Sequence, residues 1–193
     1  MNWSSVKNEF LNSTNSIEIF EKDNVTDKYN TIMEAIVNNT DSIVINKYLR
    51  LLGSGQSLYE NIFLFNLEVE RAFGEKNYIV AYDAFGGFFS TKGTIHYFAP
   101  DTLEWEDLEM NYNEFVKWVL SENLRDFYSS FFWDKSEDML NNLKLGQGIL
   151  IYPYLWAKEC NINTAVKKLV PYKEILEINA EFYGDFSNAE IGE

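Results

Sequence analysis

The chain has 193 residues, of which 46% are hydrophobic and 17% aromatic, so it can bury a sizeable core without disulfides or metals. Its formal net charge of −14, from 30 acidic and 16 basic side chains, disfavours direct binding to nucleic acid and to anionic lipid. No stretch approaches the roughly 20 apolar residues of a membrane helix, and the N-terminal residues lack a signal-peptide pattern. We therefore expect one cytoplasmic globular domain, residues 1–193, with no membrane contact.

Short apolar patterns at the start of the chain predict alternating strands and helices. Residues 17–20 and 42–46 are typical of strands. Between them, the spacing of apolar side chains predicts a helix that begins near residues 23–24 and ends at residues 38–39.

A loop with two glycines follows at residues 53–55. It has neither the third glycine of a dinucleotide fingerprint nor the Lys-Ser/Thr of a P-loop, and it is not a serine-hydrolase elbow. We expect a structural turn, with backbone amides that could bind an anion as the alternative. Ser57 and Glu60 then have capping-box spacing, which predicts a short helix through about residues 64–65.

Residues 78–99 predict an aromatic β-hairpin that anchors the fold. A glycine pair at residues 86–87 indicates a bend or bulge in its first arm. A two-residue turn at residues 92–93 would place Phe89 opposite His96, although Lys-Gly is not the preferred pair for such a turn.

Pro100 ends the hairpin, and we expect the chain to leave the sheet there through a strongly acidic run. Within 14 residues this run has six carboxylates and no lysine or arginine, which predicts a negative surface patch. Trp118 lies off the apolar stripe of the next helix, so it is either covered by another segment, which we favour, or exposed as an interface anchor. The candidate partner-binding residues are Asp101, Glu104, Glu106, Asp107, Glu109, Glu114 and Trp118.

The second half of the chain is predicted to be helical in its middle. Residues 112–120 form an amphipathic stripe, with Asn111 and Glu114 suited to its first turn. Residues 149–155 predict a strand, and a last helix is expected from Pro171 to Gly184. These elements together predict an α+β fold, a central, largely antiparallel sheet flanked by helices in a single domain.

Few residues in this chain could carry catalysis. His96 is the only histidine and is expected to be a satisfied sheet residue, and Cys160 is the only cysteine. Asp83 is expected to bond to nearby backbone amides in a turn, with an altered pKa as the alternative. No cofactor, metal site or catalytic residue is therefore assigned.

Several motifs resemble a bacterial family catalogued as domain of unknown function 2625. The resemblance covers residues 49–176, and FAPDTLEWEDL is its most specific part. Upstream of residue 49, a glycine pair expected from the family is absent. The motifs that carry the resemblance are LRLLGSG (49–55), YDAFGGFF (82–89), IHYFAPDTLEWEDL (95–108), YNEFVKW (112–118), ILIYPYLW (149–156) and VPYKEI (170–175).

More distantly, the order of helix, LGSG loop, aromatic hairpin and Phe-containing helix is similar to the SUKH superfamily. That resemblance implies a SUKH-like fold and, as in many members, an immunity protein that neutralises a toxin. An acidic surface would suit a basic toxin. We interpret the chain as a non-enzymatic acidic binding protein with a basic protein partner. The alternatives are a small enzyme with a site near Asp83 and His96, and a self-associating scaffold.

Overall fold

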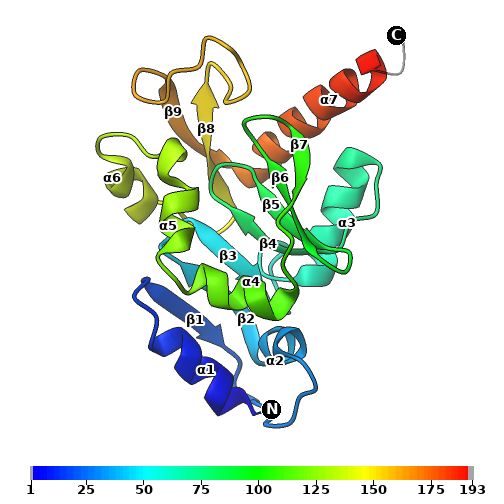
Figure 1. Ribbon diagram of the computed structural model, residues 1–193, viewed down its shortest axis with the longest axis vertical. Helices are drawn as coiled ribbons and strands as arrows, with labels where there is room; N and C mark the ends of the chain where they lie inside the picture. Colours follow the sequence, from blue (N-terminus) through cyan, green and yellow to red (C-terminus); the bar gives the residue numbers. More distant parts are fainter. Residues whose placement is uncertain (1, 191–193) are drawn as a thin grey trace.

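A seven-stranded antiparallel sheet forms the centre of the molecule, and its strand order, β1 to β7, is the order of the chain (Figure 1). The computed structural model describes residues 2–190, with side chains through residue 184. The predicted α+β fold with a largely antiparallel sheet is confirmed, as are the strands expected at residues 17–20 and 42–46. The strands of this sheet are β1 (Ile17–Glu21), β2 (Thr40–Ile45), β3 (Leu49–Leu52), β4 (Ile79–Asp83), β5 (Phe88–Thr91), β6 (Ile95–Ala99) and β7 (Glu104–Asp107).

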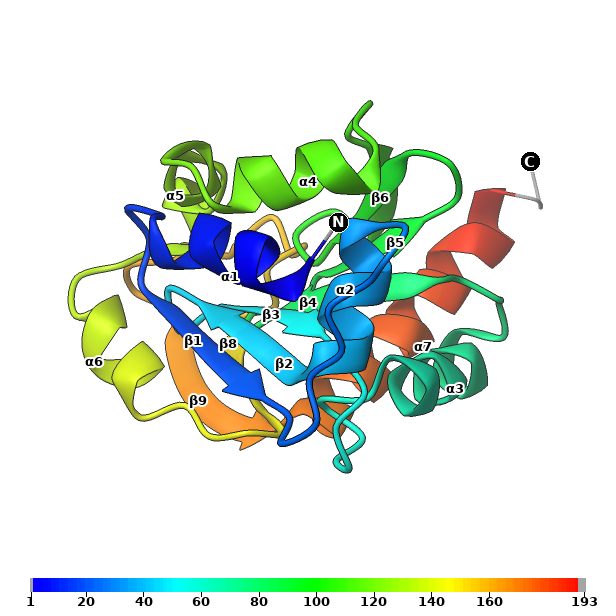
Figure 2. The same cartoon turned by 90° about the horizontal axis from the view of Figure 1, so that it is seen from below.

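Helices cover both faces of the sheet, and a separate two-stranded hairpin lies against one face (Figure 2). Figure 2 shows α1, α4 and α5 on one side, and α3, α7, β8 and β9 on the other. The helices are α1 (Trp3–Leu11), α2 (Ile32–Asn39), α3 (Ile62–Phe73), α4 (Tyr112–Val119), α5 (Asn123–Phe127), the 3-10 helix η1 (Ser129–Phe131), α6 (Ser136–Asn141) and α7 (Tyr172–Glu190). The hairpin is formed by β8 (Gln147–Tyr152) and β9 (Val166–Pro171).

Side-chain alternation along the strands divides the core between the two faces. On the face of α4 and α5, the ring centroids of Phe89 and Phe115 are 5.0 Å apart. On the opposite face, Tyr82 stacks on Phe65 of α3 at 4.7 Å and also contacts Tyr172 of α7. The aromatic side chains of the central strands thus fix helices on both sides of the sheet.

The β8–β9 hairpin connects α7 to the centre of the sheet. The Ile149 amide donates to the carbonyl of Ala84, directly after β4, at 2.7 Å. β9 was not predicted, and Pro171 is its last residue instead of the first helical one. Gly184 does not end the last helix, because α7 continues to Glu190.

The register predicted for the aromatic hairpin is wrong by one residue. Phe89 pairs with Tyr97, and Ser90 pairs with His96. The turn contains three residues because Gly93 adopts φ +102°, and the Lys92 amide donates to the Thr94 carbonyl at 3.0 Å.

Two predicted helix starts are wrong because other residues cap these helices. α2 begins at Ile32, where the Thr31 hydroxyl accepts a hydrogen bond from the Glu34 amide. α3 begins at Ile62 after the Asn61 cap, so Ser57 lies in the preceding turn. α3 also continues well beyond the predicted end, to Phe73, where Gly74 caps it at φ +71°.

Candidate functional site

The acidic run after the hairpin stays in the sheet and forms its last strand, contrary to the expected exit loop. β7 pairs with β6, Trp105 lies opposite Phe98, and their ring centroids are 5.4 Å apart. β7 is therefore an edge strand, with one row of backbone groups that pairs with no other strand of the sheet.

Three of the predicted acidic residues form one patch at this edge. Asp101, Glu104 and Glu106 are all exposed. Partial burial, together with the negative charges of Asp101 and Glu104, raises the pKa of Glu106 above its usual value. We call these three residues the acidic edge.

The other predicted acidic residues have local partners or positions. Asp107 accepts a hydrogen bond from the Glu109 amide at 2.9 Å, which lowers the pKa of Asp107, and its carboxylate lies 3.8 Å from the His96 imidazole. Glu109 is exposed. Glu114 accepts from the Asn111 amide at 2.8 Å and completes the expected capping box of α4. Asp107 and Glu114 thus already have intramolecular partners.

Trp118 is half-buried and packs against other aromatic side chains. Its ring lies 5.1 Å from Phe127 and 6.1 Å from Phe115, measured between centroids. The expectation that another segment covers this tryptophan is confirmed, since Phe127 belongs to α5.

Asp83 is fully buried and accepts four hydrogen bonds. Its Oδ1 accepts from the amides of Phe85 at 2.8 Å and Gly87 at 2.9 Å. Its Oδ2 accepts from the hydroxyls of Tyr97 and Tyr128, each at 2.8 Å. Burial raises the pKa of the Asp83 carboxyl, and these hydrogen bonds oppose the rise. The turn-forming role predicted for Asp83 is confirmed.

The glycine pair beside Asp83 is required by close approach. A Cβ on Gly87 would collide with the Asp83 carboxylate and the Tyr97 hydroxyl. Gly86 adopts φ +99°, and its carbonyl accepts a hydrogen bond from Asn179 of α7 at 3.1 Å. The bend after β4 therefore joins the sheet to α7.

The two candidate catalytic residues of the hairpin do not come together. Asp83 and Tyr97 share one face of the sheet, and His96, the neighbour of Tyr97, points to the other. Burial raises the pKa of the Cys160 thiol, which disfavours the reactive thiolate. Among the side chains of residues 2–184, no three from His, Cys, Asp or Glu are placed to share a metal ion.

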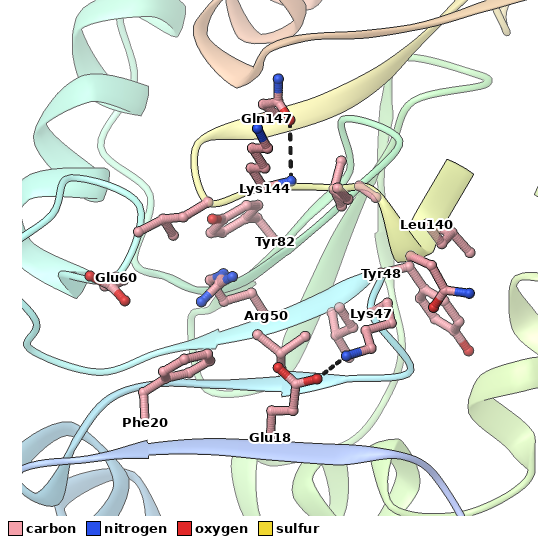
Figure 3. A pocket seen from close by; sticks show the side chains of 16 residues that line it. Glu18, Phe20, Lys47, Tyr48, Arg50, Glu60, Tyr82, Leu140, Lys144 and Gln147 are labelled. Atoms are coloured by element: carbon pink, nitrogen blue, oxygen red, sulfur yellow. Dashed lines mark hydrogen bonds and ion pairs between the residues drawn. The ribbon is translucent and has the colours of Figure 1, made fainter. Parts of the chain in front are cut away.

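A groove of about 220 Å³ lies on the same face of the sheet as α3 and α7, at the β1 end (Figure 3). Strands β1 to β4 form its floor, and α6 and the segment that leads to β8 form the wall opposite this floor. The residues that line it are Glu18, Phe20, Val44, Lys47, Tyr48, Leu49, Arg50, Glu60, Tyr82, Ala84, Leu140, Asn141, Leu143, Lys144, Leu145 and Gln147.

Strand register places the floor residues of this groove in one row. Glu18 pairs with Val44, Val44 with Arg50, and Arg50 with Tyr82, so all four side chains point to the same face. These residues are far apart in the sequence and form no motif. The only local signal is Arg50 inside the apolar strand LRLL, where a charged side chain indicates a partly open face.

Three bases and two acids line the groove, which contrasts with the acidic excess of the chain. Lys47 forms an ion pair with Glu18. Arg50 donates to the Ser42 hydroxyl at 2.6 Å and lies over the Phe20 ring, 5.8 Å from its centroid. Neither Arg50 nor Lys144 takes part in an ion pair in the described part of the chain, whereas Lys47 does.

A second hollow of about 370 Å³ adjoins the groove across the turn between β2 and β3. Asn46 and Lys47 both have positive φ in this turn, which is the geometry of a tight hairpin. The two hollows share Lys47, Tyr48, Leu140 and Asn141, and the second adds Arg125 as a further base.

Helix α3 has an exposed apolar face that the sequence interpretation missed, because the helix was expected to end too early. Phe63 is 61% exposed, Leu67 is 63% exposed, and Tyr78 beside them is 46% exposed. A helix that packs one side on the core needs only one apolar stripe. The apolar residues around the rest of this helix were therefore the signal in the sequence for an exposed apolar face.

These features define a class: an α+β protein with a seven-stranded antiparallel sheet, an acidic edge at one end of that sheet and a groove lined by both bases and acids at the other. None of the described helices is long and apolar enough to cross a membrane. The chain belongs to the family described as "Protein of unknown function DUF2625", whose model matches residues 1–175. The predicted family is confirmed, but the match also includes the residues before Leu49.

Two relatives match nearly the whole chain. The uncharacterised protein YbfG of Escherichia coli is 28% identical over 205 residues, covering 96% of this chain and 93% of its own. An uncharacterised protein of Haemophilus influenzae is 26% identical over 212 residues, covering 97% of this chain and 89% of its own. No solved structure matches, and the SUKH resemblance is not among these matches.

Proposed function

We propose that this protein is a non-enzymatic binding protein whose partner is a protein with a basic surface, and that the acidic edge makes the contact. One observation carries the proposal. Asp101, Glu104 and Glu106 lie exposed in and just before the edge strand β7, and partial burial together with repulsion from Asp101 and Glu104 raises the pKa of Glu106. A cationic partner would relieve this repulsion.

The charge of the whole chain supports the same role. A formal net charge of −14 attracts a basic protein from a distance and raises the association rate at low salt. The unpaired edge of β7 adds backbone groups that a partner strand or loop can bind.

The finer proposal is an immunity-type protein that neutralises a basic toxin. The resemblance to the SUKH superfamily supports it, because many members have that role, and the acidic edge has the charge that a basic toxin needs. An exposed edge strand also suits contact with another protein better than the turnover of a small substrate.

Affinity capture tests the proposal with two matched variants. The first carries Asp101→Asn, Glu104→Gln and Glu106→Gln, and the control carries Glu174→Gln, Glu177→Gln and Glu181→Gln on the exposed side of α7. Both lose three negative charges. We expect the wild type and the control to retain a basic protein from source-cell lysate at low salt, and the first variant to lose it.

High salt should release the same protein from the wild type. Recovery of no basic protein at either salt concentration, or equal loss with both variants, would contradict the proposal. Mass spectrometry of the retained protein then shows whether it is a toxin, which tests the finer proposal.

A second candidate function is self-association, which the exposed apolar face of α3 favours. Light scattering at increasing protein concentration tests it. Leu67→Asp should abolish any dimer while the fold is kept, because Leu67 is 63% exposed. A monomer at all concentrations would exclude this candidate.

A further inference from the structure

We propose that the groove between β1–β4 and the segment after α6 is a binding site for a small organic anion, held by Arg50 and Lys144. This site lies at the opposite end of the sheet from the acidic edge. The inference is independent of the proposed function, since it concerns other residues and a ligand of opposite charge.

Arg50 is oriented but only partly used. Its guanidinium has five N–H donors; Nη1 donates to the Ser42 hydroxyl, and an interaction with the Tyr82 hydroxyl opposes the rise in the pKa of that phenol. The Phe20 ring supports the guanidinium from one side. Because Arg50 is half-buried and has no acidic partner within residues 2–184, it can offer further donors to an incoming carboxylate or phosphate.

Lys144 approaches the groove from the other wall. This residue lies on the segment that also carries Gln147, and Figure 3 shows its side chain extending toward Gln147. The Gln147 side chain accepts a hydrogen bond from the Lys144 backbone amide at 3.2 Å, which fixes this segment. Two cations from different elements therefore line one hollow, and the flexible Lys144 side chain can turn toward an oxyanion bound by Arg50.

The size and lining of the groove limit the ligand to a small molecule. Its volume of about 220 Å³ is below the roughly 300–1,000 Å³ of pockets for drug-sized ligands. Phe20, Tyr82 and Leu145 add apolar surface for an organic body. Burial raises the pKa of Tyr82, so its phenol stays neutral and does not repel an anion.

The two acids of the groove have different effects on such a ligand. Glu18 is neutralised by its ion pair with Lys47. Glu60 has no ion pair in the described structure and would repel an anion. Removal of the Glu60 charge should therefore tighten binding of an anion, whereas it would weaken binding of a ligand held by an ammonium group.

Isothermal titration calorimetry with three aromatic probes tests the site, using phenyl phosphate, benzoate and neutral benzyl alcohol. We expect saturable binding of at least one anion and none of benzyl alcohol. Arg50→Gln and Lys144→Gln should each weaken anion binding about tenfold, the loss expected for one charge-assisted hydrogen bond. Glu60→Gln should strengthen it.

The control variants are Arg71→Gln and Lys76→Gln, which remove the same charges outside the groove and should leave affinity unchanged. Thermal unfolding of each variant shows that it is folded. Binding of phenyl phosphate alone identifies a phosphate ester as the ligand class, and binding of benzoate alone identifies a carboxylate. The proposal would be overturned if neither anion binds, or if benzyl alcohol binds equally well. It would also be overturned if the control variants lose as much affinity as the groove variants, or if Glu60→Gln binds the anion more weakly.

Discussion

The acidic edge and the groove lie at opposite ends of one sheet and differ in how their charges are arranged. At the edge, three exposed carboxylates of one sign come from a single short stretch of chain. In the groove, bases and acids from distant segments face a hollow. Exposed charge of one sign acts over a distance and favours a large partner, whereas mixed charge in a hollow favours a small ligand of defined shape.

The difference shows that a dense run of charged residues in a sequence does not by itself form a binding site. Asp107 and Glu114 belong to the same run as the acidic edge, yet each is bonded within the protein. Arg50 stands alone in its strand, yet it faces a cavity. What each residue binds is decided by the strand register and by the segments packed above the sheet.

The largest effect on stability is expected from a substitution of Asp83, whose hydrogen bonds hold the central part of the sheet. Asp83→Ala leaves four buried donors without an acceptor, so we expect the free energy of unfolding to fall by about 3 kcal/mol or more. Tyr128→Phe removes one of these bonds and should cost about 1.5 kcal/mol. Urea denaturation measures both values. An Asp83→Ala variant no less stable than Tyr128→Phe would disprove the role of Asp83 as a hub.

A smaller effect is expected from a variant that changes the acidic edge and leaves the groove intact. Neutralising Asp101, Glu104 and Glu106 together should slow association with a basic partner about tenfold at low salt, because electrostatic steering is lost. Anion binding in the groove should stay the same or become slightly tighter. Stopped-flow association kinetics measure the first quantity and calorimetry the second. A comparable loss of anion affinity would show that the two regions are not independent.

The groove is expected to contribute little to stability. Arg50→Leu should lower the free energy of unfolding by only about 1 kcal/mol, because Arg50 forms no ion pair within the described residues and leucine keeps the apolar contact with Phe20, while the buried Ser42 hydroxyl loses its hydrogen bond. The same variant should lose anion binding. A large destabilisation, measured by thermal unfolding, would mean that Arg50 is a structural residue.

The smallest effect concerns the pH dependence of the acidic edge. The pKa of Glu106 is raised in the folded state, so this residue lowers stability as pH rises from the unfolded value of 4.5 through the folded value. Glu106→Gln removes that loss and should be more stable above this range by a few tenths of a kcal/mol. At lower pH the gain should vanish. Added salt should reduce it, and a destabilised variant at neutral pH would contradict the inferred repulsion.

Much of the fold could be predicted because its signals are local. The short apolar runs of β1 and β2 and the Asn111 and Glu114 cap of α4 each depend on neighbouring residues, and all were predicted. The hairpin register was missed by one residue because Gly93 allows a third turn residue. β7 was missed because charged side chains hide its pattern, and only pairing with β6 makes it a strand.

The sites were harder to predict than the fold. The acidic edge could be located because its residues are close in the sequence. The groove could not, since its lining extends from Glu18 to Gln147 and depends on a strand register that sequence patterns leave open. Charge on Arg50 is visible in the sequence, but the cavity in front of it is not.

The strand order of the sheet has a consequence for synthesis on the ribosome. Each strand from β2 to β7 pairs with the strand made just before it, so the sheet can grow as the chain emerges, without waiting for distant segments. The floor of the groove is complete once β4 has been made, but its other wall needs Gln147. A nascent chain that ends after β7 would therefore already carry the acidic edge, while the groove proposed to bind an anion would still be open to solvent on one side.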